Sequence, residues 1–267
     1  MPATDAERLA ELKYAPERCR GGLAGGACMR TEPLYLEDSY LRRCEARVLE
    51  VERVKGRRAY VVLDRTVFHP LGGGQPSDVG FIAGAGGRME VRKALLLDGE
   101  LKHWGVFAEG ELGEGDEVVC EIDWGRRYAV MRLHTAGHIL DYAMAALFGR
   151  PVDTLEAFHG PPEAYLEYDA ERPPDPALLE EVANEVVRAD LPVVAKLVRR
   201  EELPEHLYNA PNLRRLPAAE AYRVVEIPGA NAMPCTGTHV RRTGEVGGVK
   251  VLRVEKRIGY RVYYTVT

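Results

Sequence analysis

Four side chains that can bind a metal ion occur in this chain as two pairs with the same spacing. His134 and His138 are four residues apart in RLHTAGHIL, and Cys235 and His239 are four apart in PCTGTH. A spacing of four places both imidazoles of the first pair on one face of a helix, one turn apart, where one cation can bind both. Sets of cysteine and histidine suit tetrahedral zinc, so these four residues predict a Zn²⁺ site.

Each pair alone has a second interpretation. Two histidines on an apolar helix face are often buried structural side chains, and CTGTH by itself is equally ambiguous. Both pairs in one domain favour the metal. The other histidines have no partner at ligand spacing, and we expect them to be structural or exposed: His69, His103, His159 and His206.

The first pair lies within a predicted helix. Apolar residues recur at helical intervals through residues 126–149, and a glycine ends the run. A hairpin is expected over 155–169, and Asp175 as cap with Pro176 as first residue indicates a second helix. Four further strands are expected, at 192–200, 221–229, 246–256 and 260–266. Residues 125–267 are therefore expected to form an α+β domain of two helices and an antiparallel sheet.

Residues 34–124 are predicted to form a small β-barrel, because short apolar runs alternate with glycines at the intervals typical of an all-β domain. Their unusual segment, FHPLGGGQPSDVG, contains Gly72, Gly73, Gly74 and Gln75. Glycines let the backbone approach a ligand closely, and Gln75 offers a donor and an acceptor. Glycine runs also form simple tight turns, and this one is neither a Walker loop nor a dinucleotide fingerprint, so the segment alone leaves its role open.

The composition bounds the class of protein. A chain of 267 residues with 46% hydrophobic content can fill two cores. The chain has no run of about 18 apolar residues and no apolar signal segment, which predicts a cytoplasmic protein with no place in a membrane. Five cysteines form an odd, scattered set that is typical of reduced thiols. Residues 1–33 are interpreted as an N-terminal extension and linker, and the sequence leaves the oligomeric state open.

Charge is distributed unevenly along the chain. The net charge of −5 gives no general nucleic-acid signal. From Arg214 to the end, however, ten Lys and Arg stand against four Glu, a local charge of +6. Such a region beside a metal site can attract a polyanion, and it can equally be a solvated face.

Three segments, in this order, carry a family resemblance. LDRTVFHPLGGGQPSDVG, RLHTAGHIL and CTGTHVRRTGEVGGVKVLRVEKRIGYRVYY resemble the AlaX family of freestanding alanyl-tRNA editing proteins, of the medium-length type, and the editing domain of alanyl-tRNA synthetase. The resemblance covers residues 34–267. It implies zinc-dependent hydrolysis of the ester between a wrong amino acid and the terminal ribose of tRNA(Ala), chiefly in Ser-tRNA(Ala). Whether Gly-tRNA(Ala) is also a substrate stays open.

The resemblance also implies the site residues. It assigns zinc to the His134, His138, Cys235 and His239 set and places the glycine-rich motif at the substrate. The family often shows CGGTH, whereas Thr236 replaces the first glycine here, and a positive φ at that position would strain threonine. Zinc that activates water needs an open coordination position. We therefore expect His239 to be a distant or exchangeable fourth ligand that acts as a proton shuttle.

Selection of serine over alanine requires a group that hydrogen-bonds the serine hydroxyl. Thr154 is the candidate, because the family places a selecting threonine in that neighbourhood, and Gln75 and Thr135 are the alternatives. The acceptor end of tRNA(Ala) is expected to contact basic side chains through its phosphates, and strand alternation allows only some of them to share a face. The expected phosphate-contacting set is Arg214, Arg215, Arg241, Arg242, Lys250, Arg253, Lys256 and Arg257.

Three other classes of protein compete with this interpretation. A metallopeptidase is disfavoured because HTAGH lacks the glutamate that HExxH uses as general base. If Cys235 were a nucleophile paired with His239, activity would survive chelation and fail with thiol alkylators. A non-catalytic tRNA-binding module with a structural zinc would bind tRNA without turnover.

Overall fold

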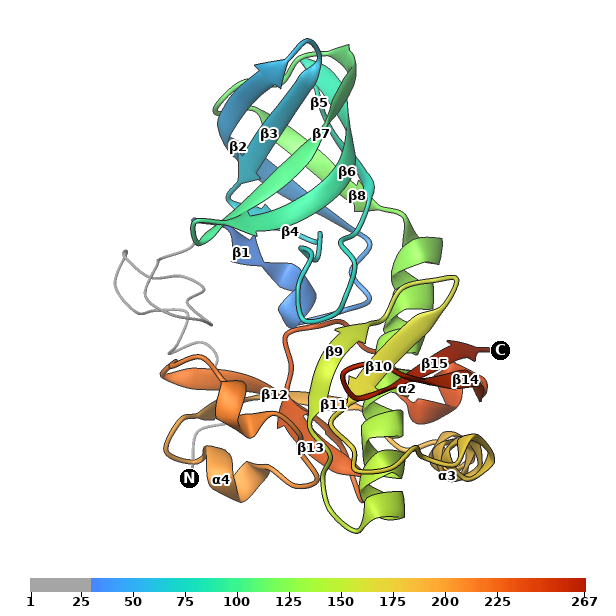
Figure 1. The fold of residues 1–267 in the computed structure, drawn as a ribbon. Coiled ribbons are helices and arrows are strands. Elements are labelled where there is room, and N and C mark those ends of the chain that lie inside the picture. The colour runs from blue at the N-terminus through green and yellow to red at the C-terminus, as the bar shows by residue number, and fades with distance from the viewer. Residues whose placement is uncertain (1–29) are drawn as a thin grey trace. The chain divides into compact units, whose positions relative to one another are not determined.

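The computed structural model describes residues 30–267, which form two compact units (Figure 1). The first contains Val79–Ile122 and the described residues up to Pro70, and the second contains Leu71–Asp78 and Asp123–Thr267. The glycine-rich segment therefore groups with the second unit, whereas the sequence pattern placed it within the β-domain of residues 34–124. Most of the expected N-terminal extension, with Cys19 and Cys28, lies outside the described residues.

The first unit is a closed antiparallel barrel with the strand order β2-β3-β7-β6-β5-β8. Buried and more exposed residues alternate along β7 and β8, because successive side chains of a strand point to opposite faces. The predicted barrel is confirmed, although β5 was not predicted because its sequence, GFIAG, has one β-branched residue. The barrel strands are β2 (Arg43–Lys55), β3 (Arg58–Leu63), β5 (Gly80–Gly84), β6 (Gly87–Leu97), β7 (Glu100–Gly110) and β8 (Glu117–Ile122). A short parallel pair, β1 (Glu32–Pro33) and β4 (Arg65–Thr66), belongs to the same unit.

Helix α2 (Trp124–Phe148) is the central element of the second unit. Asp123 caps its start by accepting a hydrogen bond from the N–H of Arg126, and Gly149 ends it with a φ of 69°. Buried residues occur all round this helix, because it packs against α3 and against strands of both sheets of the unit. A helix buried in this way can hold polar side chains away from water.

The rest of the second unit consists of helix α3 (Pro176–Arg188), the short helix α4 (Leu203–His206) and two antiparallel sheets. Asp175 caps α3 as predicted, and α3 packs on α2 and β14. The sheets have the orders β14-β15-β10-β9 and β11-β12-β13. Their strands are β9 (Thr154–Phe158), β10 (Ala164–Tyr168), β11 (Val194–Arg199), β12 (Ala221–Ile227), β13 (Asn231–Pro234), β14 (Val249–Lys256) and β15 (Tyr260–Val266).

The predicted α+β fold class is confirmed, including the hairpin of β9 and β10. Strand β13 and helix α4 were not predicted, because each has four residues and lacks a recognisable period. Within the described part of the chain, every helix is too short or too polar to cross a bilayer.

Candidate metal centre

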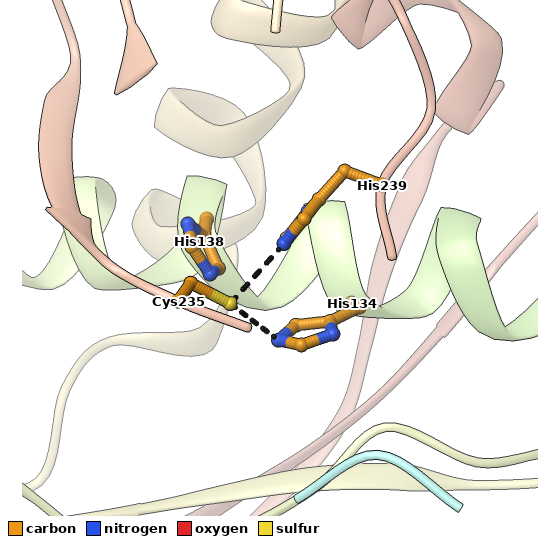
Figure 2. A group of neighbouring side chains, drawn as sticks. All are labelled: His134, His138, Cys235 and His239. Carbon is orange, nitrogen blue, oxygen red and sulfur yellow. Dashed lines mark hydrogen bonds between the residues drawn. The ribbon is translucent and has the colours of Figure 1, made fainter. Parts of the chain in front are cut away.

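The four predicted ligands come together in the second unit (Figure 2). His134 and His138 lie one turn apart on α2, and Cys235 and His239 lie in the loop after β13. Their ligand atoms are all within 4.8 Å of one another. The Sγ of Cys235 is 3.6 Å from Nε2 of His134 and 3.4 Å from Nε2 of His239. A tetrahedral zinc ion with Zn–N bonds of about 2.0 to 2.1 Å and Zn–S bonds of about 2.3 Å has an N···S edge of roughly 3.5 Å. The two S···N distances of Cys235 therefore fit zinc.

His239 is a full member of this cluster. Its Nε2 lies closer to the Cys235 sulfur than Nε2 of His134 does. His239 therefore does not stand at a distance from the other three ligands, and the other form of the expectation, an exchangeable fourth ligand, stays a prediction.

The protonation states suit a cation. Burial lowers the pKa of His138 to about 3, with smaller contributions from His159 and Arg223, so this imidazole is neutral at pH 7. Burial raises the pKa of the Cys235 thiol, while Arg223 and the N–H of Gly237 oppose that rise. A bound metal ion deprotonates a coordinating thiol, which removes this obstacle.

Gln75 orients His134 within the cluster. Its fully buried Oε1 accepts hydrogen bonds from Nδ1 of His134 (2.9 Å) and from the N–H of Thr238 (2.9 Å). Its Nε2 donates to Oγ1 of Thr238 (2.9 Å). The N–H of Thr238 can only donate, so its bond to Oε1 fixes the direction of the amide. Because its Nδ1 proton is bound to Gln75, His134 presents the lone pair of Nε2 to the cluster. These contacts support an orienting role for Gln75, and its predicted contact with substrate stays a prediction.

Thr135 and Asn231 make comparable contacts to the other imidazole-bearing residues. Oγ1 of Thr135 lies 3.1 Å from Nδ1 of His239, and the side-chain amide of Asn231 donates to the carbonyl oxygen of His138 (2.7 Å). Nδ1 of His138 is buried and has no hydrogen-bond partner among residues 30–267. A buried imidazole nitrogen that the protein leaves unpartnered is costly, and it fits a residue set built to bind a cation.

The CTGTH loop requires one glycine, and that glycine is Gly237. Neither Thr236 nor Gly237 is among the described residues with positive φ, and Thr236 is exposed, so threonine is unstrained there. A Cβ on Gly237 would clash with the ring of His134. Arg223 holds the loop by donating to the carbonyl oxygens of Cys235 (2.8 Å) and Gly237 (3.0 Å). The departure from the family pattern thus falls where a side chain has room.

The glycine-rich segment forms a tight turn. Gly72 and Gln75 exchange backbone hydrogen bonds of 3.1 and 2.9 Å, while Gly73 and Gly74 have φ of 58° and 77°. Two consecutive positive φ angles are readily adopted by glycine and produce a hairpin turn. The carbonyl of Gly74 accepts from the N–H of His159 (2.8 Å), so the turn carries Gln75 to the site. Contact between these glycines and substrate stays a prediction.

Two residues near the cluster were missed by reasoning from the sequence. The ring of His159 stacks on that of His134, with centroids 4.3 Å apart, and its Nδ1 is 2.7 Å from the hydroxyl of Tyr264. No spacing in the sequence links His159 to the ligands. Asp141 follows His138 by three residues on the same face of α2, a helical interval that could have revealed it. Burial raises the pKa of Asp141 to about 7.

Thr154 is connected to the cluster through Asp141. It begins β9, is 7% exposed, and its Oγ1 donates to Oδ1 of Asp141 (3.4 Å). Asp141 is also one of the groups that act electrostatically on the Cys235 thiol. The hydroxyl of Thr154 is therefore one residue removed from the ligands, and its role toward substrate stays a proposal.

Several basic residues of the expected phosphate-contacting set are already neutralised within the protein. Their ion pairs join Arg242 to Asp190, Arg253 to Glu163 and Glu255, and Arg257 to Glu255. Arg214 and Lys250 are exposed and have no such carboxylate partner among residues 30–267. A register shift between Val251 and Arg253 puts Lys250 and Arg253 on one face of the sheet and Lys256 on the other.

Known proteins match this chain along most of its length. Residues 37–126 match the family described as tRNA synthetases class II (A), and residues 222–261 match the threonyl and alanyl tRNA synthetase second additional domain. The alanyl-tRNA editing protein AlaX-M of Saccharolobus solfataricus is 36% identical over 243 residues, which are 88% of this chain and 99% of that protein. AlaX-M of Methanosarcina mazei is 34% identical over 249 residues, 85% of this chain and 92% of its own length.

Longer proteins match as well. The alanine–tRNA ligase of Pyrobaculum neutrophilum is 38% identical over 236 residues, 85% of this chain. The chain spans only 26% of the length of that ligase.

The barrel, the α+β unit and the His₃Cys cluster belong to a protein of the class that matches the second additional domain of threonyl- and alanyl-tRNA synthetases, here over residues 222–261. Within that class, the chain belongs to the AlaX-M family of alanyl-tRNA editing proteins. The resemblance noted in its three sequence segments is thereby confirmed.

Proposed function

We propose that this chain removes a wrong amino acid from tRNA(Ala) by hydrolysing the aminoacyl ester, chiefly in Ser-tRNA(Ala), with Zn²⁺ held by His134, His138, Cys235 and His239. The observation that carries the proposal is the cluster of four ligand atoms within 4.8 Å of one another, with the Sγ of Cys235 3.4 and 3.6 Å from Nε2 of two histidines. Names of the AlaX-M relatives support the substrate class. We expect the protein to act in the cytoplasm on the acceptor end of tRNA(Ala).

The residues have distinct roles in this proposal. Zinc, when bound, supplies polarisation of the ester carbonyl and a lowered pKa for water. Gln75 orients the His134 imidazole. We assign His239 as an exchangeable fourth ligand: Thr135 contacts its Nδ1, and its Nε2 serves in proton transfer when it is not bound to the metal. Thr154 supplies a hydroxyl that pairs with the serine hydroxyl, and a pocket built in this way can reject a substrate without that group by about 10⁴.

Deacylation of seryl-, glycyl- and alanyl-tRNA(Ala), with and without a metal chelator, tests the proposal. We expect rapid loss of serine, sparing of alanine, loss of activity on chelation and recovery when zinc is returned. Elemental analysis of the purified protein should find zinc, and Cys235→Ala should contain less of it. Activity that survives chelation but fails after thiol alkylation would contradict the proposal and identify Cys235 as a nucleophile.

One observation favours an alternative, a non-catalytic tRNA-binding module with a structural zinc. Four protein ligands complete a tetrahedron, and structural zinc sites are closed in this way, whereas catalytic sites keep a position open. The alternative predicts tRNA binding without turnover of any aminoacyl ester. It also predicts that chelation unfolds the second unit.

Thr154→Val tests the selecting hydroxyl separately. The substitution keeps the volume and removes the hydroxyl, so deacylation of Ser-tRNA(Ala) should fall relative to that of Ala-tRNA(Ala). Thr154→Ser keeps a hydroxyl and serves as the matched control. Unchanged rates with both substrates in Thr154→Val would remove Thr154 from the pocket.

A further inference from the structure

Thr154 is held from three directions. Its hydroxyl donates to Oδ1 of Asp141 (3.4 Å) and its N–H donates to Oδ1 of Asn212 (3.0 Å). Its carbonyl oxygen accepts from Nη1 of Arg215 (2.9 Å). The backbone and side chain of this one buried residue are thus fixed by three polar residues from two other segments of the second unit.

The partner of the hydroxyl lies on the ligand face of α2. His134, His138 and Asp141 occur at intervals of four and three, which place them on one side of a helix. Asp141 is 8% exposed, so this side of α2 is buried at Asp141 as it is at the two histidines. The carboxyl group of Asp141 is not among the four ligands of the proposed site, and the proposed mechanism gives it no role.

The direction of the hydrogen bond between Thr154 and Asp141 suggests a role for Asp141. A threonine hydroxyl has one proton and two lone pairs. When the hydroxyl proton is used in the hydrogen bond to Asp141, only the lone pairs of Oγ1 remain for any other partner. A bound group can then pair with Thr154 only if it donates a proton, as a serine hydroxyl can and an alanine methyl cannot.

The backbone contacts keep this geometry in place. Asn212 has a φ of 62°, and its N–H donates to Oδ1 of Asp153 (2.7 Å) while its side chain binds Thr154. The same segment is tied to the strand that leads into Cys235, because Asn209 donates to the carbonyl of Ala230 (2.7 Å). Thr154 is therefore connected through Asn212 and Asn209 to the residue just before β13, the strand that precedes the Cys235 loop.

We propose that Asp141 is a specificity-determining positioning residue, which accepts the hydrogen bond of the Thr154 hydroxyl and leaves the lone pairs of Oγ1 for a hydroxyl-bearing aminoacyl group, while Asn212 and Arg215 hold the Thr154 backbone. This inference rests on the proposed function. It adds the residue that sets which way the selecting hydrogen bond runs.

A double-mutant cycle in the full-length protein tests it. The kcat/KM for Ser-tRNA(Ala) and Ala-tRNA(Ala) is measured in the wild type, Asp141→Ala, Thr154→Val and the double variant. Asp141→Ala should reduce the serine-to-alanine ratio by about tenfold or more, the equivalent of one buried hydrogen bond. Because Asp141 acts through Thr154, adding Asp141→Ala to Thr154→Val should change the ratio little further.

Companion variants separate this role from a structural one. Asp141→Leu fills the space of the carboxyl group without an acceptor, and it should lower the serine-to-alanine ratio of kcat/KM as Asp141→Ala does. Asp141→Asn keeps an oxygen acceptor and should retain most of the wild-type serine-to-alanine ratio. Asp169→Ala removes an exposed carboxylate from the end of β10 and should match the wild type. Zinc content and Tm are measured for every variant.

The outcomes distinguish the two proposals. If the wild type does not deacylate Ser-tRNA(Ala), both fail. If the wild type is selective and the ratio survives in Asp141→Ala and Asp141→Leu, this inference fails while the proposed function stands. Effects of Asp141→Ala and Thr154→Val that multiply in the double variant also overturn it, as does an equal fall of both rates together with loss of zinc.

Discussion

Gly237 and the imidazole of His134 fix each other's position, because the CTGTH loop passes directly over the ring. A Cβ at this position would clash with the ring and lie 2.8 Å from Oε1 of Gln75. The neighbouring Thr236 is exposed and free of such a constraint. One loop residue thus decides whether the first ligand of the cluster can keep its orientation.

Gly237→Ala should therefore weaken zinc binding by about tenfold or more, because a metal ligand that loses its supporting contacts typically costs 10 to 100 fold in affinity. Competition against a chromogenic chelator measures the affinity. Thr236→Gly restores the more common CGGTH pattern and is the matched control, for which we expect wild-type affinity. Wild-type zinc binding by Gly237→Ala would show that the loop and helix are not coupled in this way.

His103 is a buried histidine of the barrel with a different role. Its Nδ1 contacts the carbonyl of Val61 (2.9 Å) and its Nε2 contacts Oγ1 of Thr66 (2.8 Å). Burial lowers its pKa from 6.5 to about 4, and the bond to Val61 opposes this shift. Below pH 6.5 the unfolded chain binds a proton that the folded barrel does not, so stability falls as the pH drops from 6.5 through 4.

His103→Gln, which can keep both contacts without titrating, should remove this acid sensitivity. The difference in unfolding free energy between pH 7.5 and 4.5 should shrink by about 2 to 3 kcal/mol relative to the wild type. Urea denaturation followed by Trp104 fluorescence, in a Trp124→Phe background, measures it. The partly exposed His206→Gln is the control, and an undiminished pH dependence in His103→Gln would assign the acid sensitivity to other groups.

Among the elements, the segment Leu71–Asp78 and helix α2 are joined by a buried ion pair. Arg127 is fully buried and Asp78 is 3% exposed, with Nε of the arginine 3.0 Å from Oδ1 of the aspartate. Gln75 lies three residues before Asp78 in the same segment. The ion pair therefore anchors the turn that orients His134.

Asp78→Ala should lower the unfolding free energy by about 3 to 5 kcal/mol, because it leaves the Arg127 charge buried without its partner. Urea denaturation measures the loss, and zinc affinity should fall with it as Gln75 is released. The double variant Asp78→Leu with Arg127→Met removes both charges and should recover most of the stability. A double variant no more stable than Asp78→Ala would mean that the ion pair itself, and not the unpaired charge, dominates.

Much of this arrangement could be predicted from local patterns. The helix of the first ligand pair, the Asp175 cap and the β9-β10 hairpin all follow from periods, caps and turns within a few residues. The grouping of Leu71–Asp78 with α2 could not, because it depends on contacts such as Asp78 with Arg127, 49 residues apart. Likewise, the four ligands carry a spacing signal, whereas His159 reaches the cluster through contacts remote in sequence, by stacking on His134 and donating to the carbonyl of Gly74.

At the scale of the whole molecule, the net charge is −5, but the region from Arg214 to the end is basic, and its charges are unequally available to a phosphate. Arg253 lies between Glu163 and Glu255, whereas Arg214 has no carboxylate partner among residues 30–267. An arginine already paired inside the protein releases few counterions when a phosphate approaches. Binding of tRNA should therefore depend on some of these residues far more than on others.

Arg214→Ala should weaken tRNA binding and reduce the slope of log K against log salt by nearly one, the value for one phosphate contact of about 0.7 to 0.9. Arg253→Ala should change that slope less. Filter binding of tRNA(Ala) between about 50 and 200 mM salt measures both. Wild-type binding that hardly weakens over this range would contradict phosphate contacts altogether, and equal slopes for the two variants would contradict the distinction between them.

The passage of Leu71–Asp78 into the second unit has a consequence for dissecting the protein. The unit that contains the His₃Cys cluster is not one continuous stretch of polypeptide. Cutting the gene at residue 123 would therefore express α2 with Arg127 lacking Asp78 and His134 lacking Gln75. Such a fragment would contain the Arg127 charge without its partner and the His134 imidazole without the hydrogen bond that orients it. Any shortened version that is to stay functional must therefore include the eight residues Leu71–Asp78, joined to α2 by a new linker.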